Sequence, residues 1–338
     1  MSVDTTKQTM RTQKPFTVFT GIMLLAAAIL TSCGGKKTTT AAGMDHVKIG
    51  YLPMVSSLTY FVATEKKYFL EQNLEIEASP IKTSDGLAQE LQKSQIDVCI
   101  ELSIVPLLRN SASGDQYFKI FSTSSIEADT AFDGILVRGD SPISTMQELS
   151  GKSIATFPGT TSKASIIQVF KKLYPNTPLP IFKEGIAPPD QLNSLAKGEV
   201  DAIHAYEPLM TIGLVNYKFK NAAGSVYAAQ INPNPIGVGA LSGPFLRERK
   251  DVAKRVVVAL DKAVDFIRSH PAEARRILAK YTNAEPSICD RMRIMPMSES
   301  SKTNIPNLQE YLDILKSIGE NNNPSKASDL VIQKDFTK

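Results

Sequence analysis

The sequence has no tryptophan and only three cysteines and three histidines in 338 residues. The histidines, His46, His204 and His270, are far apart in the chain, so they do not supply the clustered ligands of a metal site. We therefore expect no metal and no other cofactor. The chain also lacks the Gly-x-x-x-x-Gly-Lys-Ser/Thr motif of phosphate-binding loops and the Gly-x-Ser-x-Gly motif of many serine hydrolases. The absence of these motifs argues against a nucleotide-hydrolysing enzyme with a phosphate-binding loop and against a serine hydrolase of that type.

The three cysteines occur in three different settings. Cys99 lies in an apolar run, Cys289 lies in a polar segment, and Cys33 follows a small-residue site near the N-terminus. A disulfide between Cys99 and Cys289 would need an oxidising compartment and the close approach of two distant segments. Nothing in the sequence brings these segments together, so we expect two free thiols.

The first 33 residues have the pattern of a bacterial lipoprotein signal. Three basic residues precede a stretch without charged residues between Lys14 and Lys36, and its apolar core covers only 22–30. That core is shorter than the roughly 20 apolar residues that a membrane-spanning helix needs. Small residues then come directly before Cys33, as at a signal cleavage site. The sequence therefore predicts a lipoprotein signal peptide over 1–32.

Processing at this site would make Cys33 the first residue of the mature protein. Acyl chains such as palmitate on this cysteine would anchor the protein to the membrane, and residues 33–45 would form a flexible tether. The alternative is an uncleaved anchor that uses the uncharged stretch 15–35. The position of the cysteine favours processing, which places the folded part on the periplasmic or extracytoplasmic face of a bacterial membrane.

The predicted mature chain, 33–338, is long and nearly neutral. Its 306 residues are many for a single hydrophobic core, so two lobes are expected. It contains 35 basic and 33 acidic residues, a net charge of +2, with no long basic run and no internal repeat. This charge distribution argues against nucleic acid as a partner. We expect a monomer.

Apolar runs of strand length alternate with segments of helical periodicity. This order predicts an α/β protein with mostly parallel sheets covered by helices. Strands are expected at 47–52, 74–78, 96–100, 118–122, 134–137, 153–157, 200–205 and 237–241, with a further extended segment at 226–231. Helices are expected at 58–67, 86–93, 104–110, 146–149, 163–173, 189–197, 250–269, 272–280 and 307–318. Ser56 or Ser57 could cap the first helix, and Ser84 or Asp85 the second.

Five segments in a fixed order resemble the solute-binding proteins of ABC importers. The resemblance is to the branch that includes nitrate, taurine, alkanesulfonate and thiamine-precursor binders. The segments depart from the usual pattern at Lys67, Asn73 and Ser94, where glycine is common in the family. They are 47–53, 63–74 (ATEKKYFLEQNL), 91–98, 136–155 (LVRGDSPISTMQELSGKSIA) and 195–208 (LAKGEVDAIHAYEP).

The resemblance implies the type II periplasmic binding protein fold, with two α/β lobes joined by two crossings. The crossings would lie near 122–133 and 231–237. One lobe would comprise 46–128 plus 237–338, and the other 129–236. A small-molecule ligand would bind in the cleft and close the lobes around it. The partners implied are an ABC permease and its ATPase.

Hydroxyl groups at strand-to-helix junctions are the first candidates for ligand contact. Backbone N–H groups at a helix start and the helix dipole favour polar or anionic ligand groups. The simpler explanation for each hydroxyl is helix capping. The candidates are Thr160, Thr161 and Ser162, with Ser56 and Ser57 at another junction and Ser103 at a third.

Tyr206 and Glu207 directly follow the expected strand 200–205, and each is a candidate for a different kind of ligand contact. Tyr206 could stack on a ring, and Glu207 could accept hydrogen bonds from an amine or amide. Because Glu207 would repel a small anion, it slightly favours a nitrogenous ligand such as a pyrimidine over sulfonate or nitrate. The alternative is that Glu207 supports the hinge.

Three further groups of polar residues have a structural explanation. Asn234 and Ser124–Ser125 lie near the predicted crossings, where they contact the ligand or satisfy hinge backbone. Glu101 ends an apolar run and could face the cleft, but pairing with a basic residue at the surface is the expectation. The histidines are expected to be structural.

The sequence thus predicts a lipid-anchored receptor that captures a small organic molecule and carries out no chemistry. Two alternatives remain, a sensory or adhesive lipoprotein and a biosynthetic enzyme on the same fold. Fold alone does not separate them.

Overall fold

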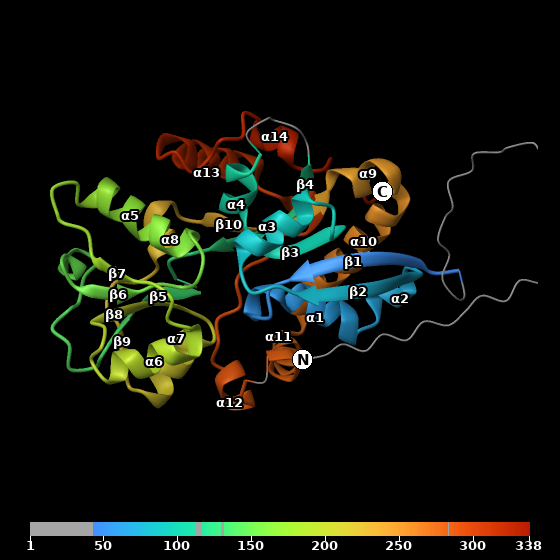
Figure 1. Ribbon diagram of the computed structural model, residues 1–338. Coiled ribbons are helices and arrows are strands. Elements are labelled where there is room, and N and C mark those ends of the chain that lie inside the picture. The colour runs from blue at the N-terminus through green and yellow to red at the C-terminus, as the bar shows by residue number, and fades with distance from the viewer. Residues whose placement is uncertain (1–42, 112–116, 130–131, 283) are drawn as a thin grey trace, which may run out of the picture. The chain divides into compact units, whose positions relative to one another are not determined.

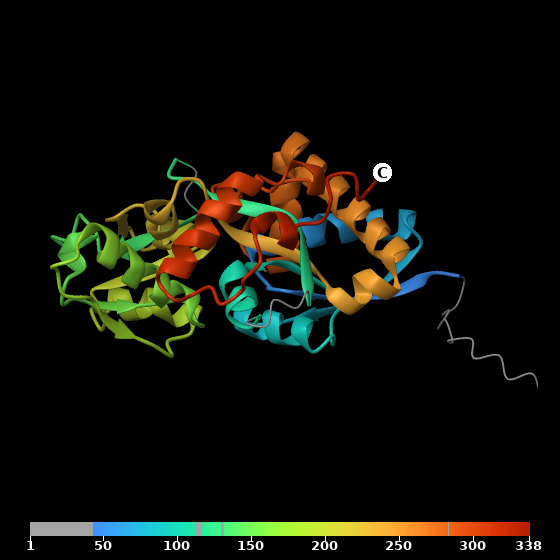
Figure 2. The same cartoon turned by 90° about the horizontal axis from the view of Figure 1, so that it is seen from above.

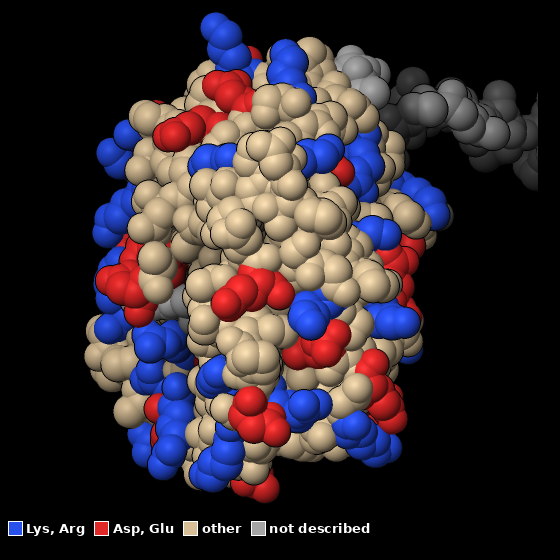
Figure 3. Space-filling view, turned by 90° about the vertical axis from the view of Figure 1, so that its left-hand side faces the viewer, with Lys and Arg blue, Asp and Glu red and all other residues tan. Residues whose placement is uncertain are grey.

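The computed structural model describes residues 43–111, 117–129, 132–282 and 284–338 (Figure 1). The signal peptide, Cys33 and most of the tether fall outside these residues, so the lipoprotein assignment stays a prediction. Within the described ranges, no helix has both the length and the apolar character needed to cross a membrane. Basic and acidic side chains are interspersed over the face in Figure 3, as expected for a nearly neutral chain.

Two five-stranded sheets form the framework of the described chain. In the first, β1 pairs in parallel with β2 and β3, and β10 runs antiparallel between β3 and β4. Its strand order is β2-β1-β3-β10-β4. The strands are β1 (Asp45–Tyr51), β2 (Leu74–Pro80), β3 (Val98–Ser103), β4 (Phe118–Ile126) and β10 (Asn234–Ser242).

The second sheet has the order β7-β6-β8-β5-β9. Here β6 pairs in parallel with β7 and β8, and β5 is antiparallel to β8 and β9. The strands are β5 (Asp133–Val137), β6 (Ser153–Ala155), β7 (Ile181–Lys183), β8 (Ala202–Tyr206) and β9 (Lys220–Asn221).

The chain passes between the two sheets twice, after β4 and before β10. This is the two-lobed α/β fold that the sequence predicts. The expectation of mostly parallel sheets is wrong, because β10 and β5 each run antiparallel to both of their neighbours. Strand β10 begins at Asn234, three residues before the start of the segment assigned to the first lobe from the sequence. Helix α13 lies beside the second passage, where Asn307 Nδ2 donates to the Pro233 carbonyl at 3.0 Å (Figure 2).

Helices cover both sheets. In the first lobe these are α1 (Leu58–Glu65), α2 (Tyr68–Glu71), α3 (Ser84–Gln92), α4 (Ile104–Arg109), α9 (Gly243–Glu248), α10 (Lys250–Ser269), α11 (Pro271–Thr282), α12 (Pro286–Cys289), α13 (Ile305–Ser317) and α14 (Ala327–Leu330), with the short 3-10 turn η1 (Val55–Ser57) before α1. In the second they are α5 (Thr161–Leu173), α6 (Pro188–Ala196), α7 (Leu209–Asn216) and α8 (Val226–Gln230), with the 3-10 turn η2 (Gln147–Leu149).

Alternate residues of β5 show how the second sheet is buried on both faces. Ile135 and Val137 join the cluster that contains α5 and α8, whereas Leu136 joins the cluster that contains α6 and α7. Side chains of successive strand residues point to opposite faces, so one short strand supplies both clusters. A single larger cluster surrounds the first sheet.

Several local predictions are wrong at helix starts. Residues 226–230 are not extended but form α8, which the Ser225 hydroxyl caps by accepting from Ala228 N at 3.0 Å, whereas Ile231 is extended. Thr83, not Ser84 or Asp85, caps α3. Ser57 makes no capping hydrogen bond to α1. Cys99 and Cys289 are both buried free thiols, as expected.

The three positions where glycine is usual in the family have left-handed backbone. The φ angles are 59° at Lys67, 53° at Asn73 and 54° at Ser94. This conformation costs an ordinary L-residue about 1–2 kcal/mol, whereas glycine adopts it readily. Left-handed backbone at these three positions is a physical reason for glycine to be usual there.

Ser94→Gly is expected to stabilise the protein by about 0.5–1 kcal/mol, because glycine removes the left-handed strain at the cost of some unfolded-state entropy. Lys93 is a matched control, since it is adjacent and exposed and has a φ of −77°. Lys93→Gly should be destabilising by a similar amount. Urea unfolding measures the change in the free energy of unfolding for each variant. The prediction is contradicted if both variants shift this free energy in the same direction by the same amount.

Candidate functional site

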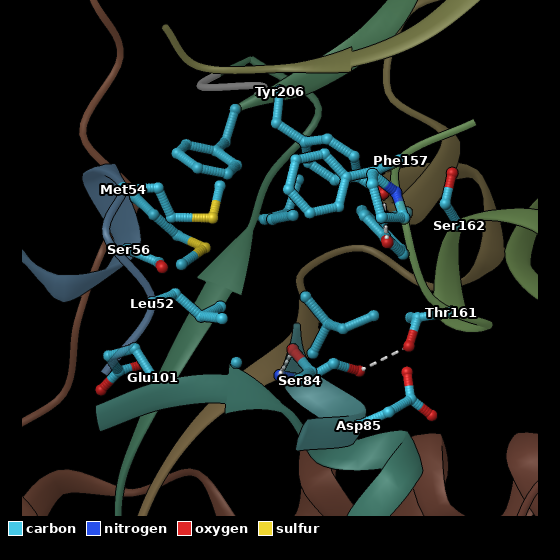
Figure 4. Close-up of a pocket in the computed structure, with 18 residues that line it drawn as sticks. Leu52, Met54, Ser56, Ser84, Asp85, Glu101, Phe157, Thr161, Ser162 and Tyr206 are labelled. Atoms are coloured by element: carbon cyan, nitrogen blue, oxygen red, sulfur yellow. Dashed lines mark hydrogen bonds between the residues drawn. The ribbon is translucent and has the colours of Figure 1, made fainter. Parts of the chain in front are cut away.

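A cavity of about 90 Å³ lies between the two lobes (Figure 4). Residues of the first lobe line one side, including Leu52 after β1, Ser56 in η1 and Glu101 in β3. Residues of the second lobe line the other, including Phe157 after β6 and Tyr206 in β8. The cavity is smaller than the roughly 300–1,000 Å³ of typical ligand pockets.

Aromatic rings form one wall of the cavity. The rings of Phe157 and Tyr206 meet edge to face with centroids 5.1 Å apart, and Tyr227 and Phe132 flank Tyr206 at 5.9 and 6.3 Å. The hydroxyls of Tyr206 and Tyr227 are hydrogen-bonded at 2.7 Å, which fixes the two rings relative to each other. This wall suits a flat, partly apolar ligand.

Glu101 places a buried carboxylate at the opposite side of the cavity. The residue is only 4% exposed. Ser122 Oγ donates to Oε1 at 2.8 Å, and Ser124 Oγ donates to Oε2 at 2.5 Å. Burial raises the pKa of the Glu101 carboxyl, and the hydrogen bonds from Ser124 and Ser122 lower it in part. Glu101 forms no ion pair with any described basic residue.

The expectation that Glu101 pairs with a basic residue at the surface is therefore wrong. Its φ of +44° is unusual for a strand residue, and the pairing of β10 with β3 is irregular between Val238 and Ala240 opposite it. Such strain costs about 1–3 kcal/mol and persists where surrounding structure enforces it, often at ligand sites. The carboxylate oxygens are held by Ser122 and Ser124 of β4, at the edge of the cavity.

Two further buried hydroxyls, one of them at the cavity, have no partner among the described residues. Ser56 Oγ and Ser57 Oγ are buried and form no hydrogen bond with described residues. Ser56 lines the cavity and its hydroxyl is directed toward it in Figure 4, whereas Ser57 is not a lining residue. An unsatisfied buried hydroxyl costs about 1–3 kcal/mol, and a polar ligand group at Ser56 would remove that cost.

The three hydroxyls at the start of α5 have separate roles. Thr161 lines the cavity and its Oγ1 lies 3.4 Å from Ser103 Oγ across the cleft. Thr160 lies outside the cavity, where its hydroxyl donates to Asp85 Oδ1 at 3.2 Å and accepts from Arg109 at 2.7 Å. Ser162 contributes to the lining, but its hydroxyl points away from the cavity in Figure 4.

Ser162 Oγ instead contacts the buried His204, whose Nδ1 lies 2.8 Å away. His204 Nε2 is 2.8 Å from Asp133 Oδ2, and the Asp133 carboxylate also accepts from Ser225 Oγ and from Val226 N. Serine, histidine and aspartate in this order form a hydrolase triad elsewhere, but here the hydroxyl is not presented to the cavity. The contacts give His204 a structural role. Among the described residues, no group of three or more His, Cys, Asp or Glu could hold a metal ion.

Glu207 and Asn234 are not among the lining residues. Glu207 accepts hydrogen bonds from Thr211 N, Thr211 Oγ1 and Arg293 N at 2.9–3.2 Å, and burial raises its pKa. Asn234 Nδ2 donates to Tyr227 O and to Gln230 Oε1. These contacts agree with the alternative that Glu207 supports the hinge and that Asn234 satisfies local backbone.

Sequence reasoning did not single out most of the apolar lining. Isolated aromatic and aliphatic residues in strands and loops have the same appearance as core residues, so no local signal marks them. The residues missed are Leu52, Met54, Ile126, Phe132, Phe157, Pro158, Tyr227, Ile236 and Met295, together with Ser84, Asp85 and Gly237.

Glu101→Gln is expected to change how stability depends on pH. Because the folded-state pKa of Glu101 is raised, the native protein loses stability as pH rises through that pKa, and glutamine does not titrate. The variant should therefore be more stable than the native protein at pH 8, with the difference shrinking toward pH 4. Urea unfolding at several pH values measures this, and a constant difference would contradict it.

Two lobes with a cavity between them define a periplasmic-binding-protein fold, and solved structures agree. The alkanesulfonate-binding protein SsuA from Xanthomonas axonopodis pv. citri, bound to MOPS, is 17% identical, with a TM-score of 0.65 over 86% of this chain and 95% of that one. A ligand-binding component of an ABC-type import system from Staphylococcus aureus, with zinc bound, is 17% identical. Its TM-score is 0.67, over 86% of this chain and 97% of that one. The nitrate-binding protein NrtA from Synechocystis PCC 6803 is 14% identical, with a TM-score of 0.64 over 87% of each chain.

Residues 55–274 match the family described as NMT1/THI5 like, so the chain belongs to that family. No curated protein sequence matches the chain.

Proposed function

We propose that this protein is the solute receptor of an ABC importer and that it captures a small nitrogenous molecule, such as a pyrimidine, in the cavity between its lobes. It delivers the ligand to a permease and its ATPase and carries out no chemistry on it. Family membership supports a solute-binding role. The observation that carries the choice of ligand is the buried carboxylate of Glu101, which accepts hydrogen bonds from Ser122 and Ser124 but forms no ion pair with a described basic residue.

The charges around the cavity favour a ligand with N–H donors or a positive charge. The described lining contains two acidic residues, Asp85 and Glu101, and no lysine or arginine. A buried carboxylate without a cation is costly, and a ligand that donates hydrogen bonds offsets that cost. Nitrate or a sulfonate would instead place a second negative charge near Glu101.

The contacts proposed for such a ligand come from both lobes. A pyrimidine ring would lie against Tyr206 and Phe157, and its amino group would donate to Glu101. Ser56, Ser103 and Thr161 would complete the polar contacts. Thr160 acts outside the cavity, because its hydrogen bonds to Asp85 and Arg109 join the lobes at the rim. Ligand entry therefore requires these contacts between the lobes to open.

A thermal-shift titration of the purified protein tests this proposal. A 4-aminopyrimidine and thiamine are compared with taurine and nitrate at matched ionic strength. A ligand that binds only the folded state stabilises it by about 2.7 kcal/mol at a hundredfold excess over its dissociation constant. We expect a saturable shift with the nitrogen heterocycles. A shift only with the anions would keep the receptor role and overturn the ligand class.

Lipid on Cys33 is proposed to hold the receptor at the outer face of a bacterial membrane. Cys33→Ser removes the acylation site, so the protein should no longer incorporate labelled palmitate. Cys289→Ser is the matched control, because Cys289 is buried in the folded part. Unchanged palmitate incorporation in Cys33→Ser would contradict lipidation at Cys33.

A further inference from the structure

Four arginines surround a second cavity, separate from the one between the lobes. This groove has a volume of about 550 Å³ and is lined by the end of α10, the start of α11 and residues 291–297. Met295 is the only described residue that lines both cavities. The described lining contains no aspartate or glutamate, and its apolar part includes Met292, Ile294 and Pro296. The four basic residues are Arg268, Arg275, Arg291 and Arg293.

The contacts within the protein leave much of this positive charge unmatched. Arg268 is the most fully paired, because its Nη2 contacts Asp265 and Glu299 at 2.7 and 2.6 Å. Arg293 Nη1 donates to a backbone carbonyl, that of Asp129, at 2.8 Å.

The other two arginines have fewer partners. Arg275 Nη2 lies 3.4 Å from the Met292 carbonyl, and its Nε is buried without a hydrogen-bond partner among the described residues. Arg291 is exposed and makes no side-chain hydrogen bond or ion pair with a described residue. Arg275 and Arg291 therefore have donors to offer a ligand.

Guanidinium groups keep their charge at every pH at which proteins fold, so four of them around one groove repel each other. A buried charged donor without an acceptor is unfavourable by more than a neutral one. The planar fork of arginine matches the geometry of a carboxylate, phosphate or sulfate group and binds it through two parallel hydrogen bonds. An oxyanion would satisfy both the unmatched charge and the unpaired Nε.

We infer that this groove is a second binding site, which takes a small oxyanion through Arg275 and Arg291. The volume of about 550 Å³ allows a ligand larger than a single inorganic ion, with an apolar part against the methionine and proline side chains. The site does not depend on the ligand proposed for the cavity between the lobes.

Isothermal titration calorimetry with phosphate, sulfate and citrate tests the inference, with ionic strength held constant by sodium chloride. We expect saturable binding of at least one of these anions to the purified protein. Arg291→Gln and Arg275→Gln should each weaken it about tenfold or more, because each removes a charge-assisted pair of hydrogen bonds. Binding of phosphate or sulfate alone would assign the site to tetrahedral anions, and binding of citrate alone to carboxylates.

Matched variants separate a built site from a general charge effect. Arg247→Gln makes the same change of charge at an exposed arginine outside the groove and should leave anion binding unchanged. Arg291 is exposed, so its variant is expected to fold even if Arg275→Gln does not. Glu101→Gln should also leave anion binding intact, which distinguishes this site from the proposed ligand cavity. The inference fails if none of the three anions binds, or if Arg247→Gln weakens binding as much as Arg291→Gln.

Discussion

Glu101→Gln is expected to weaken the binding of a 4-aminopyrimidine by roughly 10- to 150-fold, the effect of losing a hydrogen bond to a charged group. The glutamine keeps the size of the side chain and still accepts from Ser122 or Ser124, so the cavity should keep its shape. What it loses is the negative charge that attracts the amino group of the ligand. Calorimetric titration of the native protein and the variant measures the change.

Glu207→Gln is the matched control for this experiment. Both carboxylates are buried and both have raised pKa values, but only Glu101 lines the cavity. We expect Glu207→Gln to leave the affinity within a factor of about three, since changes without direct contact are usually small. Equal losses in the two variants would show that buried charge in general, and not contact with the ligand, controls binding.

Asp133→Ala is expected to destabilise the fold by about 3–5 kcal/mol, because it leaves buried hydrogen-bond donors without an acceptor. The Asp133 carboxylate is fully buried and receives hydrogen bonds from Ser225 Oγ and Val226 N as well as contacting His204 Nε2 at 2.8 Å. Its loss removes support from β5, β8 and the start of α8 together. Urea unfolding followed by circular dichroism measures the change.

Asp140→Ala provides the comparison for this variant. Asp140 is 78% exposed in its side chain and pairs with Arg138 at 3.2 Å on the surface. Exposed ion pairs contribute about 0.2–1 kcal/mol, so this variant should remain close to the native stability. If Asp133→Ala changes stability no more than Asp140→Ala does, the network around His204 is not a structural element.

Elements with a long and regular pattern are predicted well from the sequence. The amphipathic period over 250–269 matches α10 at both ends, because twenty residues average out local irregularities. Short elements depend on single contacts that the pattern does not contain. Helix α8 is one example, since five residues became helical through the cap at Ser225.

The candidate site shows the same limit. The positions of Thr161 and Tyr206 follow from strand and helix ends, which the sequence does reveal. Glu101 is buried beside an irregular strand pair with a φ of +44°, and no residue type in the sequence predicts that backbone conformation. Glu207 is a conspicuous carboxylate in the sequence, yet its hydrogen bonds to Thr211 and Arg293 occupy it outside the cavity.

The central claim is that the cavity between the lobes selects a nitrogenous ligand through Glu101. The most direct test is a calorimetric titration of the purified protein with a 4-aminopyrimidine and, separately, with taurine at the same ionic strength. The claim predicts saturable binding of the 4-aminopyrimidine that is lost in Glu101→Gln, with no binding of taurine. Saturable binding of taurine that Glu101→Gln leaves unchanged or strengthens would contradict it.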